Sequence, residues 1–162
     1  MMMTGRWGQS KPIVTWIEPV EVIRTLLRHP ELRNPAAFTY GPSFLKDSSL
    51  QTIQLSHSAW FHRAQATVGP EHVVLAIITN ADGASTTKHK ETTFLYLRIG
   101  NVNAPYGFRS DMIKLIAIIP ELDRKACLFA ESEEEDFQRQ KLQLFHRSID
   151  IIFENFHEAG RK

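Results

Sequence analysis

Apolar and polar positions fall into blocks between residues 73 and 120, and the apolar runs there predict three successive β-strands. The first run, Val73–Thr79, is rich in β-branched residues and carries no charge, which is typical of a strand buried on both faces. In the second, Thr92–Gly100, aromatic and basic side chains alternate with leucine and isoleucine, so one face can carry a polar group. The third, Met112–Pro120, is nearly all apolar. We expect a three-stranded antiparallel sheet.

Two helices are predicted to flank this sheet. A short amphipathic helix from Pro19 to His29 has proline at its first position, where no amide is needed for the helical hydrogen bonds. A longer C-terminal helix is predicted from a capping box, Ser132 with Glu135, to a stop at Gly160. Its apolar residues recur every three or four positions and should bury against the sheet. These residues are Leu142, Phe145, Ile149, Ile152, Phe153 and Phe156.

The chain is expected to divide into three parts. Residues 1–16 contain glycine and proline without an apolar period, which is typical of a mobile N-terminal tail. Residues 17–70 hold the short helix and an irregular connection, and residues 71–162 hold the three strands and the long helix. The strands on either side of Asn80–Glu91 are expected to be adjacent and antiparallel, joined by a loop too long for a two-residue hairpin.

Length and composition fit one globular domain, with 162 residues of which 43% are hydrophobic and 23% charged. No run of about eighteen apolar residues occurs, and the first residues lack the apolar stretch of a signal peptide. We therefore expect an intracellular protein with no membrane contact. Cys127 is the only cysteine, which excludes an internal disulfide and a cysteine-based zinc cluster.

The charge balance gives no sign of a nucleic-acid surface. The 19 basic and 18 acidic residues leave a net charge of +1, and phosphate binding normally requires a basic patch. The one local cluster, Lys88–Lys90, is interpreted as a solvated loop. His57 and His62 are five residues apart and therefore off one helical face, so we favour an aromatic anchor over a metal site. That anchor would use Trp60 and Phe61.

A single carboxylate, Asp82, follows the first predicted strand and has two interpretations. Asp-Gly is an ordinary turn dipeptide, because aspartate hydrogen-bonds its own backbone and Gly83 accepts a positive φ. A carboxylate just beyond a central strand is also where a metal-dependent phosphoryl-transfer enzyme with an RNase H-like fold places its first metal ligand. Spacing alone favours the turn.

The order of several segments carries a resemblance to a known family. The segments read IITNADGAS, TTFLYLRIGNVN, IKLIAIIPELD and QLFHRSIDIIFENFHEAGRK, and upstream PVEVIRTLLRHPEL and FTYGP fit the same pattern. Together they resemble the opening of the catalytic domain of Plavaka-type transposases, DNA transposases abundant in fungal genomes. The resemblance covers nearly everything after Ile17. It favours the metal-ligand interpretation of Asp82 over the turn.

This resemblance implies an incomplete RNase H-like fold of the α/β class and an ancestral role in metal-dependent DNA cleavage and strand transfer. Asp82 would be the catalytic and metal-binding residue, with Mg²⁺ or Mn²⁺ as the cofactor, DNA as the partner and the nucleus as the location. In such folds the second carboxylate follows a fourth strand and the third lies on a later helix, and neither is evident in this chain. We therefore expect the chain to be inactive alone and to bind no metal stably.

Other carboxylates do not replace these two ligands. Asp123 follows the third predicted strand, but the second strand separates it from Asp82 by roughly 9–10 Å at the usual strand spacing. Asp111 belongs to the opposite end of that third strand. The acidic run Glu131–Asp136 is interpreted as a helix start that the helix dipole favours. In the turn before the third strand, relatives carry several basic residues, whereas this chain keeps Arg109 alone.

Three hypotheses remain open. The chain is a fragment or truncated copy of a transposase, a non-catalytic interaction module derived from one, or an independent α/β domain whose resemblance is coincidental. In the fragment the strand Val73–Thr79 would have an open edge, through which we expect self-association, and in the interaction module the same edge would pair with another chain. We favour the fragment, and the sequence leaves its target DNA open.

Overall fold

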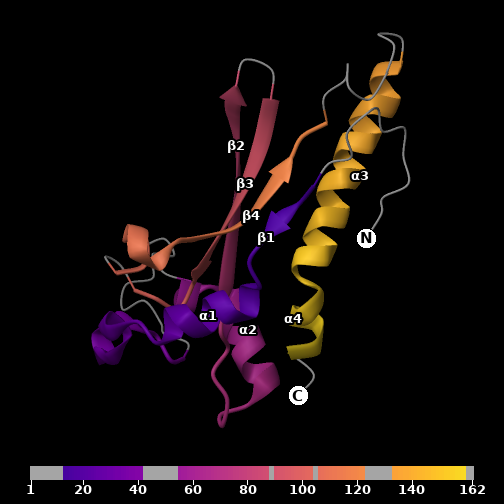
Figure 1. The fold of residues 1–162 in the computed structure, drawn as a ribbon. Helices are drawn as coiled ribbons and strands as arrows, with labels where there is room; N and C mark the ends of the chain where they lie inside the picture. Colours follow the sequence, from indigo (N-terminus) through magenta and orange to yellow (C-terminus); the bar gives the residue numbers. More distant parts are fainter. Residues whose placement is uncertain (1–12, 42–54, 88–89, 104–105, 123–132, 160–162) are drawn as a thin grey trace, which may run out of the picture. The chain divides into compact units, whose positions relative to one another are not determined.

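A computed structural model describes residues 13–41, 55–87, 90–103, 106–122 and 133–159. The fold is of the mixed α/β class, as predicted (Figure 1). Its helices are α1 (Pro19–Leu27), α2 (Ala59–Val68), α3 (Glu134–Ile152) and α4 (Glu154–Ala159). Its strands are β1 (Thr15–Trp16), β2 (Ile77–Thr87), β3 (Lys90–Ile99) and β4 (Lys114–Pro120). Short 3₁₀ helices lie at Pro30–Arg33, Pro35–Ala37, Leu55–His57, Tyr106–Phe108 and Ser110–Met112.

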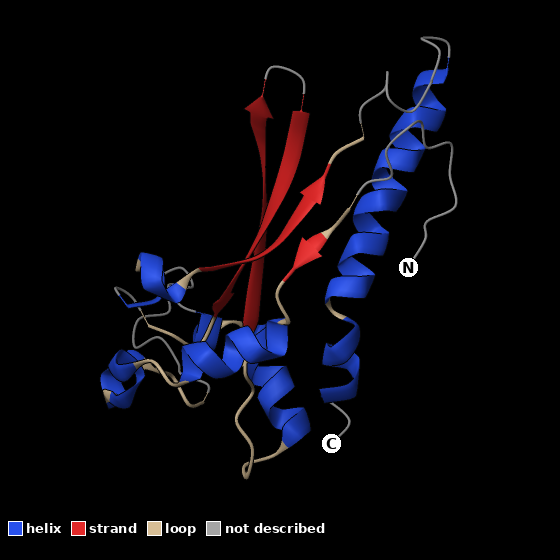
Figure 2. Ribbon diagram, viewed as in Figure 1, coloured by secondary structure: helices blue, strands red, loops and turns tan. Residues whose placement is uncertain are grey.

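The strands form a four-stranded antiparallel sheet in the order β1-β4-β3-β2 (Figure 2). The expected number of three strands is wrong, because two residues that we assigned to the N-terminal tail pair with β4. Thr15 lies opposite Ile118, and Trp16 lies opposite Ala117. Two residues are too few to show an alternating pattern, so β1 follows from pairing with its neighbour and not from a sequence signal.

The first predicted strand begins and ends later than expected. We placed it at Val73–Thr79 with a long loop after it, whereas β2 runs over Ile77–Thr87 and β3 begins at Lys90. Two backbone amides before β2 donate to side chains instead of to a neighbouring strand. The amide of Val74, for example, donates to Oε1 of Gln65 at 3.0 Å. Among the described strands β2 lies at the end of the sheet, which agrees with the open edge expected for this strand.

The chain divides into two compact units, and the boundary falls within α1, β2, β3 and β4. The first comprises Met1–Val22, Asn80–Tyr96 and Leu115–Lys162, and the second comprises Ile23–Thr79 and Leu97–Lys114. Each unit has buried apolar residues of its own. The division into residues 1–16, 17–70 and 71–162 remains a prediction.

In the first unit, one set of buried residues comes from β4 and from one face of α3. They are Ile116, Ala117 and Ile119 on β4, and Phe137, Leu144, Ser148 and Ile152 on α3. Ser148 is tolerated on this apolar face because its hydroxyl donates to the carbonyl of Leu144 at 2.7 Å. The predicted stripe is therefore correct for Ile152 and wrong for Leu142, whose side chain is 57% exposed. The buried face of α3 therefore differs from the predicted stripe. Apolar periodicity does not reveal this difference, because Ser148 is polar and belongs to the buried face.

The ends of α3 differ from the predicted ends. Ser132 and Gly160 lie outside the described residues, and Glu133 occupies the N-cap position without a capping bond from its side chain. The first turn carries acidic residues, which the positive end of the helix dipole favours. At the other end the helix is interrupted at Phe153, whose amide donates to the carbonyl of Ile149 at 3.0 Å, and α4 begins at the next residue.

In the second unit, the buried amide of Asn101 joins two segments. Its Nδ2 donates to the carbonyls of Thr39 and Val74 at 3.0 and 2.9 Å. Its Oδ1 accepts from the amide of Ala76 at 2.7 Å. A buried amide that keeps its hydrogen bonds costs little, whereas its loss would leave three buried or half-buried backbone groups without partners.

Gly100, the residue before Asn101, is closely packed, and a side chain at this position would displace Leu55. A Cβ atom at this position would lie 2.8 Å from Cδ2 of Leu55 and 3.2 Å from Cβ of Ala76. The amide of Gly100 donates to the carbonyl of Ala76 at 2.7 Å, which fixes this approach. The Gly-Asn pair that closes β3 therefore has a structural role.

The predictions of α1, β3 and β4 are confirmed, whereas α2 was missed, because residues 17–70 were expected to hold one helix and an irregular connection. Helix α1 begins at Pro19, and β3 buries the leucine and isoleucine half of its alternating pattern. Helix α2 begins after Ser58, whose Oγ accepts from the amide of Phe61 at 3.2 Å. Phe61 is buried and Trp60 is exposed, so the predicted aromatic anchor consists of Phe61.

Replacing Ile152, which is 1% exposed, with alanine should lower the free energy of unfolding by about 2–5 kcal/mol, because it leaves a cavity in the first unit. Leu142→Ala on the exposed side of the same helix should cost less than about 0.5 kcal/mol. Denaturant titration of both variants measures the difference. Equal losses would show that the buried face of α3 is wrongly assigned.

Asn101→Ala should lower the free energy of unfolding by at least about 3 kcal/mol, because each of three backbone groups then loses its partner. Asn80→Ala is the matched control, since Asn80 is exposed on β2. Thermal and denaturant unfolding of both variants would test this. A loss at Asn101 no larger than at Asn80 would contradict the structural role of the amide.

Candidate functional site

Asp82, the predicted metal ligand, lies within β2 and is exposed. Both predicted placements are therefore wrong: the residue is neither just beyond a strand nor in a turn. A Cβ atom on Gly83 would lie 3.9 Å from Oε1 of Glu121, so Gly83 faces that carboxylate. Successive residues of a strand point to opposite faces of the sheet. Asp82 therefore faces away from Glu121, and the two carboxylates cannot act on one ion.

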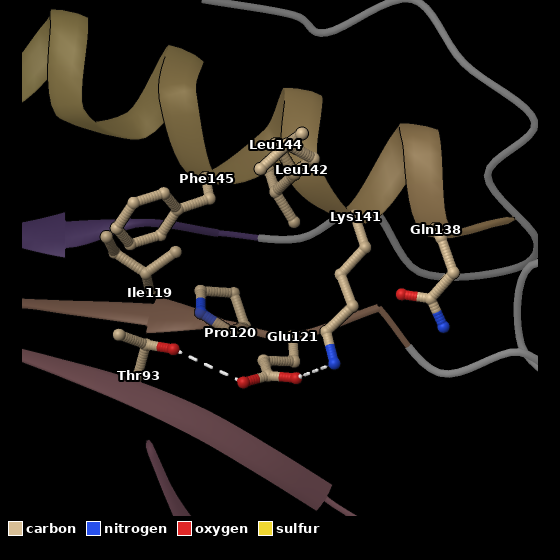
Figure 3. Close-up of a pocket in the computed structure, with 9 residues that line it drawn as sticks. All are labelled: Thr93, Ile119, Pro120, Glu121, Gln138, Lys141, Leu142, Leu144 and Phe145. Carbon is tan, nitrogen blue, oxygen red and sulfur yellow. Dashed lines mark hydrogen bonds and ion pairs between the residues drawn. The ribbon is translucent and has the colours of Figure 1, made fainter. Parts of the chain in front are cut away.

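Glu121 belongs to a polar network that joins β3, the end of β4 and α3 (Figure 3). Its Oε1 accepts from Oγ1 of Thr93 at 3.3 Å, and its Oε2 pairs with the ammonium group of Lys141. The Glu121 side chain is only 18% exposed, so this ion pair is poorly screened by solvent. Sequence reasoning missed Glu121, although an acid directly after the buried strand β4 is a usable signal.

A cavity of about 240 Å³ lies beside this network (Figure 3). Its polar lining consists of Thr93, Glu121, Gln138 and Lys141, and its apolar lining of Ile119, Pro120, Leu142, Leu144 and Phe145. The cavity thus has a polar part whose formal charges cancel and an apolar part that contains one aromatic ring. Such a cavity can hold a small neutral group that forms hydrogen bonds on one side.

A second hollow of about 510 Å³ lies on α3 and is lined by Arg139, Leu142, Gln143, His146 and Arg147. Two arginines and one histidine therefore gather on one side of the helix. This patch is not evident from the sequence, because positions 139, 146 and 147 are not a continuous run and lie together only through the helical repeat. Lys88 and His89 of the expected basic cluster lie outside the described residues.

In the second unit, Arg109 is held by carboxylates. Its Nε and Nη2 donate to both oxygens of Asp111 at 3.1 and 2.8 Å, and its Nη1 donates to Glu31 at 2.8 Å. The hydrogen bond to Asp111 raises the pKa of Arg109, and the same bond lowers the pKa of Asp111 below its ordinary value of 3.8. Nε2 of His29 lies 3.3 Å from the same carboxylate. Arg109 is therefore committed to an internal ion pair.

The described residues do not fit a two-metal centre. Among them, no group of three or more His, Cys, Asp or Glu side chains could hold a metal ion. Asp82 supplies one carboxylate, whereas divalent cations such as Mg²⁺ take about six oxygen ligands, several of them from water. Asp123 lies outside the described residues, and Asp111 is engaged with Arg109. Within the same described ranges, no helix has the length and apolar character needed to cross a bilayer.

Comparison with known families gives one match. The family model described as Plavaka transposase matches residues 2–162, which is essentially the whole chain. No curated protein and no solved structure shows significant similarity to the chain. The match includes Asp82, the Gly100-Asn101 pair and the helix that carries Lys141.

Arg109→Gln should lower stability at neutral pH, and this difference from the unchanged protein should shrink in acid. The pKa of Asp111 is lowered in the folded state, so its bond to Arg109 stabilises the fold above pH 3.8 and is lost as the pH falls through the folded-state pKa. Denaturant titration from neutral pH to below 3.8 measures the effect. Arg63→Gln, at an exposed position on α2, is the control. A difference that stays constant into acid would contradict the assignment.

Proposed function

Because the chain belongs to the Plavaka transposase family, we propose that it forms part of the catalytic core of a DNA transposase. The observation that carries this proposal is the family match over residues 2–162. In this proposal the partner is DNA, the location is the nucleus and the cofactor of the complete core is Mg²⁺ or Mn²⁺.

The strand order supports an RNase H-like arrangement for this core. Three strands that follow one another in the chain, β2, β3 and β4, are also neighbours in the sheet, and α3 comes next in the chain. The strand that carries Asp82 lies at the end of the described sheet. This is the place where the family resemblance expects a further strand.

Asp82 is the residue to which we assign a catalytic role. Its carboxylate is exposed, so it can bind a cation without burying an unpaired charge. Because the described residues supply only this one ligand, we assign DNA cleavage to a larger assembly. In it, further carboxylates come from parts of the polypeptide outside the described residues or from another chain.

The edge of β2 is the surface through which this assembly would form. An edge strand exposes amides and carbonyls that can pair with another strand, and Ile77–Thr87 contains neither lysine nor proline to prevent it. A strand added there would lie next to Asp82. This edge also supports the alternative function, a non-catalytic interaction module that pairs with a partner or with a second copy of the chain.

Residues 1–162 with Mg²⁺ or Mn²⁺ should cleave no DNA, because one carboxylate cannot hold a two-metal centre. A longer polypeptide that adds the fourth strand and the later helix, with a carboxylate on each, should cleave DNA, and Asp82→Asn should lower that activity by on the order of 10³-fold. Glu71→Gln, at an exposed acid in the loop after α2, is the control and should leave the activity unchanged.

Two outcomes would contradict parts of this proposal. Cleavage by residues 1–162 alone that disappears in Asp82→Asn would show that the chain holds a complete metal site. Full activity of Asp82→Asn in the longer polypeptide would remove Asp82 from the site. A longer polypeptide that is folded, binds one defined protein partner and never cleaves DNA would favour the interaction module.

A further inference from the structure

Leu142 separates two hollows on the surface of α3. It lines the cavity beside Glu121 and Lys141, and it also lines the basic hollow of Arg139, His146 and Arg147. Its side chain is exposed although it lies in an apolar position of the helical pattern. A ligand that lies across Leu142 can therefore reach both hollows at once.

The polar part of the cavity favours a neutral group. Glu121 offers carboxylate oxygens and Lys141 offers ammonium hydrogens, and their ion pair cancels in charge. An anion that took Lys141 for itself would leave the half-buried Glu121 carboxylate without its counter-ion, and a cation would do the reverse. A neutral edge with both donors and acceptors can bond to this part of the cavity without breaking the pair.

The rest of the cavity favours a small flat ring. Phe145, Ile119 and Pro120 supply apolar surface, and the volume of about 240 Å³ is below the range of about 300–1,000 Å³ typical of drug-sized ligands. A neutral planar ring with donors and acceptors along one edge describes a nucleobase. Unstacked bases are commonly held in this way, with an aromatic contact and hydrogen bonds to glutamate, lysine, glutamine or threonine.

The basic hollow supplies the positive charge that the phosphates of the same DNA strand would need. Arg139 pairs with Asp136 across 3.2 Å, but both side chains are more than half exposed, and such a pair contributes little stability. Arg139 can therefore exchange this carboxylate for a phosphate at little cost. Arg147 lies two helical turns further along the same side.

We propose that α3 binds single-stranded DNA across Leu142, with one unstacked base in the cavity and the adjoining phosphates on Arg139 and Arg147. This inference rests on the proposed function, because it takes DNA as the ligand. It adds a binding surface at a place other than Asp82, and the described residues that line this surface all belong to the first unit.

The phosphate contacts can be tested by salt dependence. We would measure the affinity of residues 1–162 for a fluorescent single-stranded oligonucleotide by anisotropy over a range of salt concentrations. Arg139→Ser with Arg147→Ser should reduce the slope of log K against log salt by about 1.4, since each phosphate contact to a single strand contributes about 0.7. Arg28→Ser with Arg63→Ser removes the same charge from exposed positions in the second unit and should leave the slope unchanged.

The base contact can be tested by closing the cavity mouth. Leu142→Glu should weaken binding of the normal oligonucleotide by about tenfold. When the oligonucleotide contains 2-aminopurine, the change in its fluorescence on binding should be absent with this variant. An abasic oligonucleotide should bind about tenfold more weakly than the normal one to the unchanged protein and should be less sensitive to Leu142→Glu. Leu27→Glu, at an exposed leucine of α1, is the control. Free adenosine and cytidine would show whether the base alone suffices.

The outcomes separate this inference from the proposed function. An unchanged salt slope in the double arginine variant, or equal binding of normal and abasic strands, would overturn the surface on α3. Asp82-dependent cleavage by the longer polypeptide would survive either result. Binding of free nucleosides without any binding of the oligonucleotide would overturn the DNA assignment of the cavity.

Discussion

The fold of the second unit depends on the side-chain amide of Asn101. This one group satisfies backbone atoms at three places in the chain: Thr39, Val74 and Ala76. The amides of Val74 and Ala76 donate to side chains instead of to a neighbouring strand, and the chain enters β2 only at Ile77. The amide of Gly100 donates to the carbonyl of Ala76, and a Cβ atom at Gly100 would be crowded by the side chain of Ala76. The start of β2, which carries Asp82, therefore depends on Asn101, which lies just after the end of β3.

Periodicity predicted the elements that bury one face along most of their length. The alternating pattern of β3 and the start of α1 at Pro19 agree with the structure because local sequence decides both. The position of β2 could not be predicted in this way, since Gln65 and Asn101 take its first residues out of the sheet from a distance. The two-residue strand β1 has no local signal at all.

The candidate sites also differ in whether the local sequence or contacts between distant residues determine them. Asp82 could be singled out from a family resemblance, but its placement within β2 needed the observed register of the strand. Glu121 and Lys141 are twenty residues apart on separate elements, so only the packing of α3 near the end of β4 brings their charges together. Arg139 and Arg147 line the same hollow because the helical repeat brings them to one side of α3. The net charge of the whole chain does not reveal them, because acidic residues elsewhere balance their charge.

The interruption at Phe153 makes the last six described residues a separate cooperative element. A helix as short as α4 is unstable by itself, because the first turn costs more entropy than a few hydrogen bonds return. Its order depends on the contact between the rings of Phe153 and Phe156, whose centres are 5.3 Å apart, and on the bond from Nδ2 of Asn155 to Glu18 at 2.8 Å. Helix α4 can therefore open while α3 stays folded, and its opening would release the residue that leads into α1.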